Sequence, residues 1–346
     1  MNQFIYRIVG QRSRSVLPRE KFHEEIRRKQ LVWFGEFHSE QRIVAFQHDL
    51  VAALSTPRRQ EATPRKLHVV LEHFSVEMQG ILDRFQTDPA YGFDELKRAY
   101  EDIGTEGHDL APYEGFLRYC KGGAPQDEAF HDGAAGGRRI QLHGGFLPRP
   151  LAARWNKAQG AEEKASILEE CYRRDFLPSP TTPMNGALLV DAEKLLLRGS
   201  PAHFRLIRSL MSGEDVYSPT ADAADDGGGD DASDGEAPSP IQKLYQAQLL
   251  KDHAMGYRLG KLLTEHRHDR FLVVAGFGHL KHCLGVPERL EAYLRSQAVH
   301  AADAGAREAA MHALETCTKR AAMTGCQMLY ETYLEDRYEP LKCTSA

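Results

Sequence analysis

Four short apolar runs stand out along the chain, separated by longer amphipathic segments. Each run is four or five residues long, which is typical of a strand buried inside a parallel sheet. The segments between them carry apolar residues at helical spacing. This alternation predicts an α/β fold with a mainly parallel central sheet flanked by helices. The four runs are Leu31–Phe34, Leu67–Leu71, Arg139–Leu142 and Phe271–Ala275.

The start of the chain adds a predicted strand at Phe4–Val9 and a predicted helix at Leu17–Arg28. The first 19 residues hold four arginines and no acidic residue, a balance found in mitochondrial presequences. The predicted strand leaves little of this segment to be cleaved, and no apolar stretch is long enough for a signal peptide. We therefore expect a cytoplasmic protein without a signal peptide, with the mitochondrion as the alternative.

An acidic, low-complexity stretch interrupts the second half of the chain. Residues 213–240 contain nine acidic residues, many Gly, Ala and Ser, and no Lys or Arg. This composition predicts a disordered insertion, because it offers too little apolar surface to bury. The strand pattern resumes after it, so we assign residues 1–298 to one domain. Residues 299–346 are Ala-rich and are predicted to form a helical C-terminal extension.

Composition limits the classes of partner. The net charge is −5, and without the nine clustered acids 44 Lys and Arg face 40 acidic residues. That balance is too even to predict nucleic-acid binding.

The apolar runs are much shorter than the roughly 20 residues of a membrane span, so we predict no transmembrane segment. Six cysteines without CxxC pairing indicate reduced thiols. A small-molecule ligand is the expected partner, and a homodimer is compatible with the sequence.

A polar, chemically versatile residue follows each apolar run. The carboxyl ends of parallel strands form the ligand crevice of open α/β sheets, so these residues are expected to share one site. Glu36 and His38 are two positions apart, a spacing that points both side chains to the same side of a strand. The strand-end residues are Glu36, His38, Glu72, His143 and His279.

A long predicted helix, Ile241–Leu263, carries two polar residues on its apolar face. Gln248 and Asp252 share that face with Tyr245 and Met255. Buried polar groups need partners, so Gln248 and Asp252 either brace the sheet or belong to the site.

Two kinds of protein, a hydrolase and a scaffold, are compatible with these residues on their own. Two histidines and two carboxylates suit a divalent metal such as Zn or Mn, or a metal-free acid–base pair. In a hydrolase, either a peptidase or an esterase, these four residues bind the metal or activate water, His143 polarises a carbonyl, and Arg149 holds an anionic substrate group. In a scaffold the same residues are structural, and the acidic insertion recruits a partner. The proposed metal and catalytic set is Glu36, His38, Glu72 and His279.

The order of these motifs resembles the ChaN-like haem-binding uptake proteins of the Tiki/TraB/erythromycin-esterase-like superfamily. The resemblance covers residues 4 to about 295 and rests on a GExH strand end, a later His, a strand ending in Glu, and a final GxGH followed by GxP. The matching segments are Gly35–His38, His48, Leu71–Phe74, Gln79, His143–Arg149, Gln248–Met255, Ala275–His279 and Gly285–Pro287.

This resemblance implies an α/β fold that binds haem or a related porphyrin, with hydrolysis as the alternative activity within the superfamily. Tyr113, His143 and His279 are the candidate iron ligands. The chain departs from the family at the third strand, where the usual Asn is replaced by His143-Gly-Gly, and it lacks the N-terminal lipidation cysteine of many bacterial members. The residues expected to contact the ligand are His48, Tyr113, His143, Arg149, Gln248 and Asp252.

Overall fold

A computed structural model describes most of the chain. The chain divides into two compact units. The first unit takes in Met1–Gly145, Leu262–Phe277 and His312–Ala346, and the second takes in Phe146–Lys261 and Gly278–Met311. The predicted acidic insertion falls largely outside the described part of the chain. The residues described are 6–10, 13–17, 19–56, 65–103, 107–122, 140–178, 200–212, 239–281, 284–319 and 321–325.

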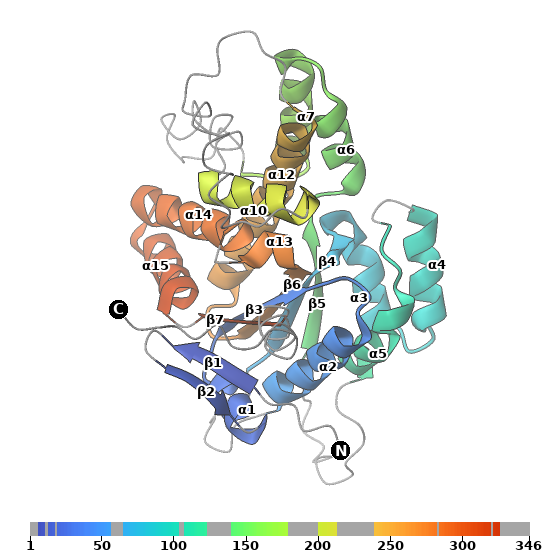
Figure 1. Ribbon diagram of the computed structural model, residues 1–346, viewed down its shortest axis with the longest axis vertical. Helices are drawn as coiled ribbons and strands as arrows, with labels where there is room; N and C mark the ends of the chain where they lie inside the picture. Colours follow the sequence, from blue (N-terminus) through green and yellow to red (C-terminus); the bar gives the residue numbers. More distant parts are fainter. Residues whose placement is uncertain are drawn as a thin grey trace. The chain divides into compact units, whose positions relative to one another are not determined.

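The first unit contains a five-stranded sheet in the order β5-β4-β6-β3-β7 (Figure 1). Strand β3 pairs in parallel with β6 and β7, and β4 pairs in parallel with β6. All four apolar runs are strands, which confirms the predicted α/β fold. The bounds are β3 Leu31–Glu36, β4 Leu67–Ser75, β5 Ile140–Phe146, β6 Arg270–Gly276 and β7 Ala321–Gly325.

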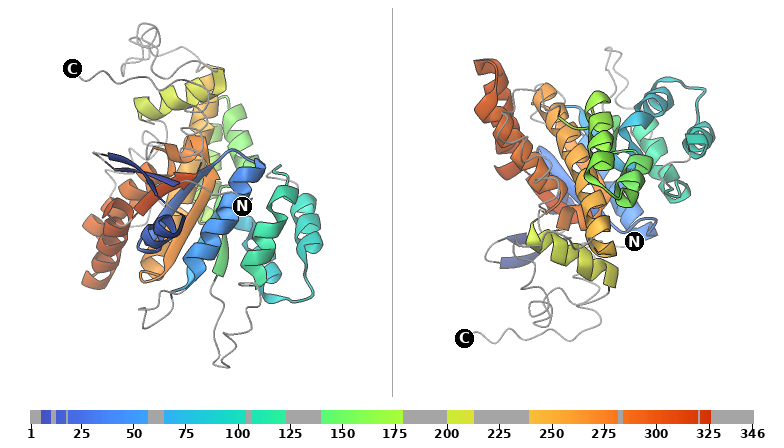
Figure 2. Two further views of the ribbon diagram at one scale, coloured as in Figure 1. Left: turned by 60° about the horizontal axis from the view of Figure 1, so that its bottom comes forward. Right: turned by 90° about the horizontal axis from the view of Figure 1, so that it is seen from above.

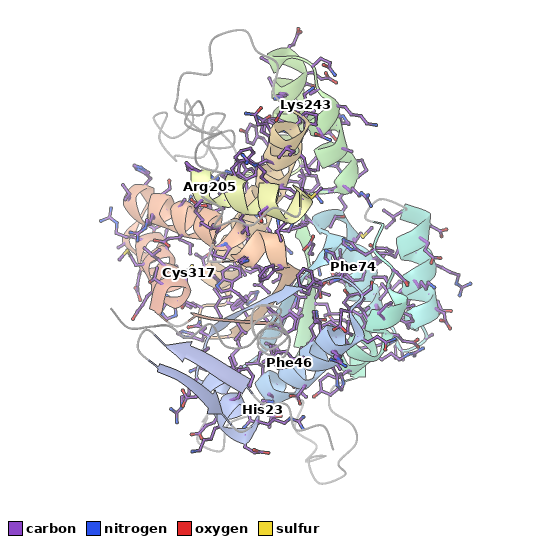
Figure 3. The ribbon with its side chains drawn as sticks, in the orientation of Figure 1. His23, Phe46, Phe74, Arg205, Lys243 and Cys317 are labelled. Atoms are coloured by element: carbon purple, nitrogen blue, oxygen red, sulfur yellow. The ribbon has the colours of Figure 1, made fainter. Side chains whose placement is uncertain are left out.

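The sheet is buried because its strands are apolar on both faces. Every residue of β3, β4 and β6 is buried. Helices α2, α3, α4 and α5 pack on one another beside the sheet (Figure 2). Phe46 on α2 and Phe74 on β4, both labelled in Figure 3, belong to the same buried cluster. The helices are α2 Gln41–Ser55, α3 Gln79–Thr87, α4 Phe93–Ile103 and α5 Glu114–Gly122, with short 3₁₀ turns η1 Val76–Met78 and η2 Ala111–Tyr113.

The first segment differs from the sequence prediction. Strands β1 (Tyr6–Gly10) and β2 (Ser13–Leu17) pair with each other in an antiparallel two-stranded sheet of their own. Helix α1 spans Arg19–Arg27, so placing Leu17 in the helix was wrong. Leu17 precedes Pro18, and the residue before a proline is disfavoured in the helical region. Strand β2 was missed because its Ser-Arg-Ser sequence forms no apolar run.

The C-terminal segment also contains more than helix. Helix α15 (Ala304–Lys319) is followed by β7, which adds an edge strand beside β3. The Ala-Ala-Met-Thr-Gly sequence of β7 has only one large apolar residue, which explains why no strand was predicted. The division of the chain at residue 298 stays a prediction.

The second unit is mainly helical. Its long helix α12 confirms the predicted helix at Ile241–Leu263 and extends one residue before it and two beyond it. No helix among the described residues is long and apolar enough to cross a membrane. The helices that lie wholly or mainly in this unit are α6 Arg149–Lys157, α7 Ala161–Arg173, α10 Pro201–Ser212, α12 Pro240–Glu265, α13 Phe277–Leu280 and α14 Val286–His300.

Candidate functional site

Glu36, the last residue of β3, is the centre of a polar cluster in the first unit. Its side chain is buried, yet several polar groups from different elements contact it. Oε1 lies 2.7 Å from Nδ1 of His38 and accepts a hydrogen bond of 3.0 Å from the Tyr113 hydroxyl. Oε2 accepts a hydrogen bond from Nε2 of Gln47 on α2. A buried carboxylate with this many partners is held in one orientation.

The charge of Glu36 is set by a balance between burial and these partners. Burial on its own raises the pKa of a carboxyl group, because it disfavours the charged form. The nearby His73 charge and hydrogen bonds from His38 and His73 outweigh burial and hold the pKa of Glu36 well below its ordinary value. Glu36 is therefore an anion at neutral pH.

A glycine at the end of β6 makes room for this cluster. Gly276 is the register partner of Glu36, and its N–H donates to Oε2 of Glu72 on the neighbouring β4. Glu72 was expected at the end of its strand, but β4 continues beyond it to Ser75. A Cβ atom at this position would lie 3.2 Å from both Glu72 Oε2 and His38 Nε2. His38 Nε2 in turn lies 3.8 Å from Glu72 Oε1. The structure thus brings Glu36, His38 and Glu72 together, and their role in binding a metal or in catalysis stays a prediction.

Two histidines belong to the cluster although the sequence did not single them out. Nε2 of His73 lies 2.8 Å from Glu36 Oε1, and the His108 ring centre lies 4.6 Å from that of His38. One ring nitrogen from each of His38, His73 and His108 lies within 4.8 Å of the others. His108 lies in the loop after α4, so no strand-end pattern marks it. His73 directly follows Glu72 within β4, and the sequence pattern indicated Glu72 as the polar residue of that strand.

Tyr113 is buried within the cluster. Its hydroxyl donates to Glu36 and accepts a 3.0 Å hydrogen bond from the N–H of Ser39. Burial and the adjacent Glu36 charge raise the pKa of the Tyr113 phenol above its ordinary value. This side chain acts here as a neutral hydrogen-bond donor.

His38 and Phe37 form the exposed edge of the cluster. The His38 side chain is 39% exposed, and Phe37 is 45% exposed. The ring of Phe37 contacts that of Phe277, with 5.6 Å between ring centres. An accessible imidazole therefore lies beside an accessible aromatic surface at the end of β3.

Two further predicted residues of the first unit have other contacts. His48 packs edge-on against Tyr119, with ring centres 4.8 Å apart. His143 lies in the middle of β5 and not at its end, because the strand continues to Phe146. Its Nε2 is 2.9 Å from Nδ1 of His68, near the start of β4. Burial lowers the pKa of His68 to about 4.

In the second unit His279 pairs with Asp252. Nδ1 of His279, on α13, lies 2.5 Å from Oδ1 of Asp252, which is fully buried on α12. Gly285, which precedes α14, has a φ of +70°, and a Cβ there would lie 2.6 Å from the His279 carbonyl oxygen and 3.0 Å from Asp252 Oδ2. The GxGH and GxP motifs therefore meet at this pair. Asp252 is therefore a buried partner of His279, and its contact with a ligand stays a prediction.

The remaining predicted residues also lie in the second unit. Arg149 is the exposed first residue of α6, and Gln248 is half-buried on α12. Their contact with a ligand, like the participation of His279 in a four-residue metal set, stays a prediction.

Comparison with known proteins agrees with the motif order. The family model described as haem-binding uptake, Tiki superfamily, ChaN matches residues 22–290. A solved structure, described as cofacial haem binding to ChaN of Campylobacter jejuni, is 17% identical to this chain and has a TM-score of 0.47. The match covers 84% of this chain and 86% of that one. Among curated protein sequences, none matches this chain. Because the family model spans most of the sequence, the chain belongs to the ChaN family of haem-binding uptake proteins in the Tiki superfamily.

Proposed function

We propose that this protein binds haem, and that His38 supplies the iron ligand through Nε2. One observation carries the proposal: His38 is an accessible imidazole whose other nitrogen, Nδ1, lies 2.7 Å from the buried anion Glu36. Since a carboxylate only accepts hydrogen bonds, Nδ1 carries the proton, and the lone pair of the ring is then on Nε2. A histidine oriented in this way is a strong ligand for iron.

The surroundings of His38 fit a porphyrin. The exposed ring of Phe37, supported by Phe277, offers an apolar surface beside the imidazole. Porphyrin sites combine such apolar contact with a small number of oriented polar groups. Haem bound here would supply the iron, and the chain would supply the Nε2 nitrogen of His38 and the aromatic ring of Phe37.

Tyr113 is less suited to ligate iron, although its side chain belongs to the same cluster. Its hydroxyl already bonds Glu36 and Ser39, and its pKa is raised, so the phenolate that iron prefers is disfavoured. His143 contacts His68. Among the described residues of the first unit, His38 therefore combines exposure with a fixed ring orientation.

Hemin titration tests the proposal. Purified protein is titrated with hemin while the Soret band is followed, and its zinc and manganese content is measured in parallel. We expect a saturable Soret shift in the wild type that His38→Ala weakens at least tenfold. The exposed His268→Ala is the control and should bind as the wild type does.

Two outcomes would overturn the proposal. A wild-type protein that gives no saturable shift does not bind haem, and stoichiometric zinc or manganese in that protein would favour the metal-dependent alternative. A His38→Ala variant that binds normally, together with a Tyr113→Phe variant that does not, would assign the iron to Tyr113.

A further inference from the structure

A second group of potential metal ligands lies at the opposite ends of the strands from Glu36 and Glu72. His68 is the second residue of β4, Asp269 directly precedes β6, and His266 lies three residues before Asp269 in the turn after α12. Because β4 and β6 pair in parallel with Leu67 opposite Arg270, their amino ends are adjacent. We call His68, His266 and Asp269 the amino-end cluster.

Backbone hydrogen bonds fix the position of Asp269. The N–H of Lys66 donates to Asp269 Oδ1 over 3.0 Å, and the N–H of Arg270 donates to the Lys66 carbonyl over 2.9 Å. The first carboxylate oxygen is thus engaged with the chain entering β4. The second oxygen, Oδ2, is directed at the two histidines.

The three side chains present two nitrogens and one oxygen to a common space. Nε2 of His68 lies 3.2 Å from Asp269 Oδ2, and Nδ1 of His266 lies 4.0 Å from the same oxygen. The three ligand atoms all lie within 4.8 Å of one another. Bonds of about 2.0–2.2 Å to a tetrahedral zinc ion place ligand atoms roughly 3.3–3.5 Å apart. The 3.2 Å distance between His68 and Asp269 is already close to this range, whereas the 4.0 Å distance between His266 and Asp269 has to contract. His266 can supply that movement, because its side chain is 37% exposed.

His68 is held in the orientation that a metal ligand needs. Its ring is fully buried between His266, with ring centres 4.4 Å apart, and Phe271, at 4.8 Å. Nδ1 lies 2.9 Å from Nε2 of His143. When Nε2 of His68 binds a cation, Nδ1 carries the proton and donates a hydrogen bond to His143. A hydrogen bond at the second ring nitrogen is the usual support of a metal-binding histidine.

We propose that His68, His266 and Asp269 bind a divalent cation of the zinc type, at a site distinct from the haem site proposed at His38. The donor set of two imidazoles and one carboxylate suits zinc, with water in the fourth position. Asp269 is 21% exposed, so solvent reaches the site from the side of His266 and Asp269.

Zinc titration of the full chain tests the site. The chelator-stripped protein is titrated with Zn²⁺ by calorimetry, and with Co²⁺ for its visible absorption. We expect His266→Ala to lose one bound equivalent, or to bind it at least tenfold more weakly. His268→Ala removes an exposed histidine two residues away and is the matched control, which should bind as the wild type does. Running both variants with His38→Ala added removes one of the three histidines of the His38 cluster and leaves any zinc bound by His73 and His108 the same in both proteins.

Equal zinc stoichiometry and affinity in the wild type and in His266→Ala would overturn the proposal. His266→Phe covers the case in which His266→Ala fails to fold, because it keeps a ring against His68 and removes the ligand nitrogen. Zinc binding by a folded His266→Phe variant with wild-type affinity would equally overturn it. Hemin binding is measured separately, so the zinc titration can still be interpreted if the haem proposal fails.

Discussion

Nε2 of His73 lies 2.8 Å from Oε1 of Glu36, although the two residues come from strands that are not neighbours in the sheet. Strand β6 lies between β4 and β3 and ends at Gly276, so no side chain separates the two residues there. Polar groups from β4 can therefore reach across the end of β6 to a carboxylate on β3. Through this contact Glu36 links β3 to β4, although the two strands do not pair with each other.

Replacing Glu36 by Gln should strongly destabilise the first unit. The variant keeps the size of the side chain, removes the buried charge, and sets an amide N–H₂ among groups that donate to Glu36. Loss of one partner from such a network costs roughly 2–4 kcal/mol of unfolding free energy. Urea denaturation at neutral pH measures the change. Glu24→Gln, on an exposed ion pair with Arg28, is the control and should change stability by less than about 0.5 kcal/mol. Equal stability of the two variants would contradict the role of Glu36.

The sequence predicted four of the five strands of the main sheet, and three strand-related members of the cluster, because these depend on local patterns. Glu36, His38 and Glu72 directly follow apolar runs, and the parallel arrangement brings such ends to one edge. The order of the sheet is not local: β6 comes late in the chain yet inserts between β3 and β4. Without that order the contact from His73 to Glu36 could not be predicted.

Other features escaped prediction for similar reasons. His108 reaches the cluster from a loop, where no periodic pattern assigns a direction to its side chain. Strand β7 has little apolar character. It lies at the sheet edge because it pairs with β3, a strand from a distant part of the sequence. His143 was placed at a strand end because its apolar run is short, whereas Gly144 and Gly145 continue the strand.

Gly276→Ala should disturb the cluster more than the fold. The added methyl group would lie 3.2 Å from Glu72 Oε2 and His38 Nε2, and Glu72 cannot withdraw without losing its bond from the Gly276 N–H. We expect hemin affinity to fall several-fold and unfolding free energy to fall by about 1–2 kcal/mol. Gly80→Ala, at an exposed position on α3 with nothing within 4 Å, is the control: it should leave hemin affinity unchanged and should not lower the unfolding free energy, since alanine favours a helix over glycine. Normal hemin affinity in Gly276→Ala would refute the crowding argument.

Gly285→Ala should destabilise the second unit through its backbone. The φ of +70° is unfavourable for alanine, and the new Cβ would lie 2.6 Å from the His279 carbonyl oxygen. Together these effects should cost about 2–3 kcal/mol. Gly160 precedes α7 just as Gly285 precedes α14, but its φ is −142° and nothing lies within 4 Å. Gly160→Ala is therefore the matched control, expected to cost only a few tenths of a kcal/mol. Thermal unfolding followed by circular dichroism compares the two, and equal costs would show that Gly285 is not constrained.

His203 should make stability depend on pH in the mildly acidic range. Its ring is fully buried on α10, its Nε2 donates to the Gly278 carbonyl over 3.1 Å, and burial lowers its pKa below the ordinary 6.5. The charge of Asp252, 4.0 Å away, opposes that shift without cancelling it. Between the folded and unfolded pKa values the unfolded chain binds more protons, so His203 lowers stability as the pH falls below about 6.5.

His203→Gln should remove this contribution while keeping an N–H donor for the Gly278 carbonyl. We expect urea denaturation between pH 8 and pH 5 to show a smaller loss of unfolding free energy on acidification for the variant than for the wild type. His268→Gln replaces an exposed histidine and should follow the wild-type profile. Above the ordinary pKa of histidine the three proteins should keep constant differences in stability. Parallel profiles for the wild type and His203→Gln across the whole range would mean that His203 takes up its proton equally in the folded and unfolded chain, and burial would then have no effect on its titration.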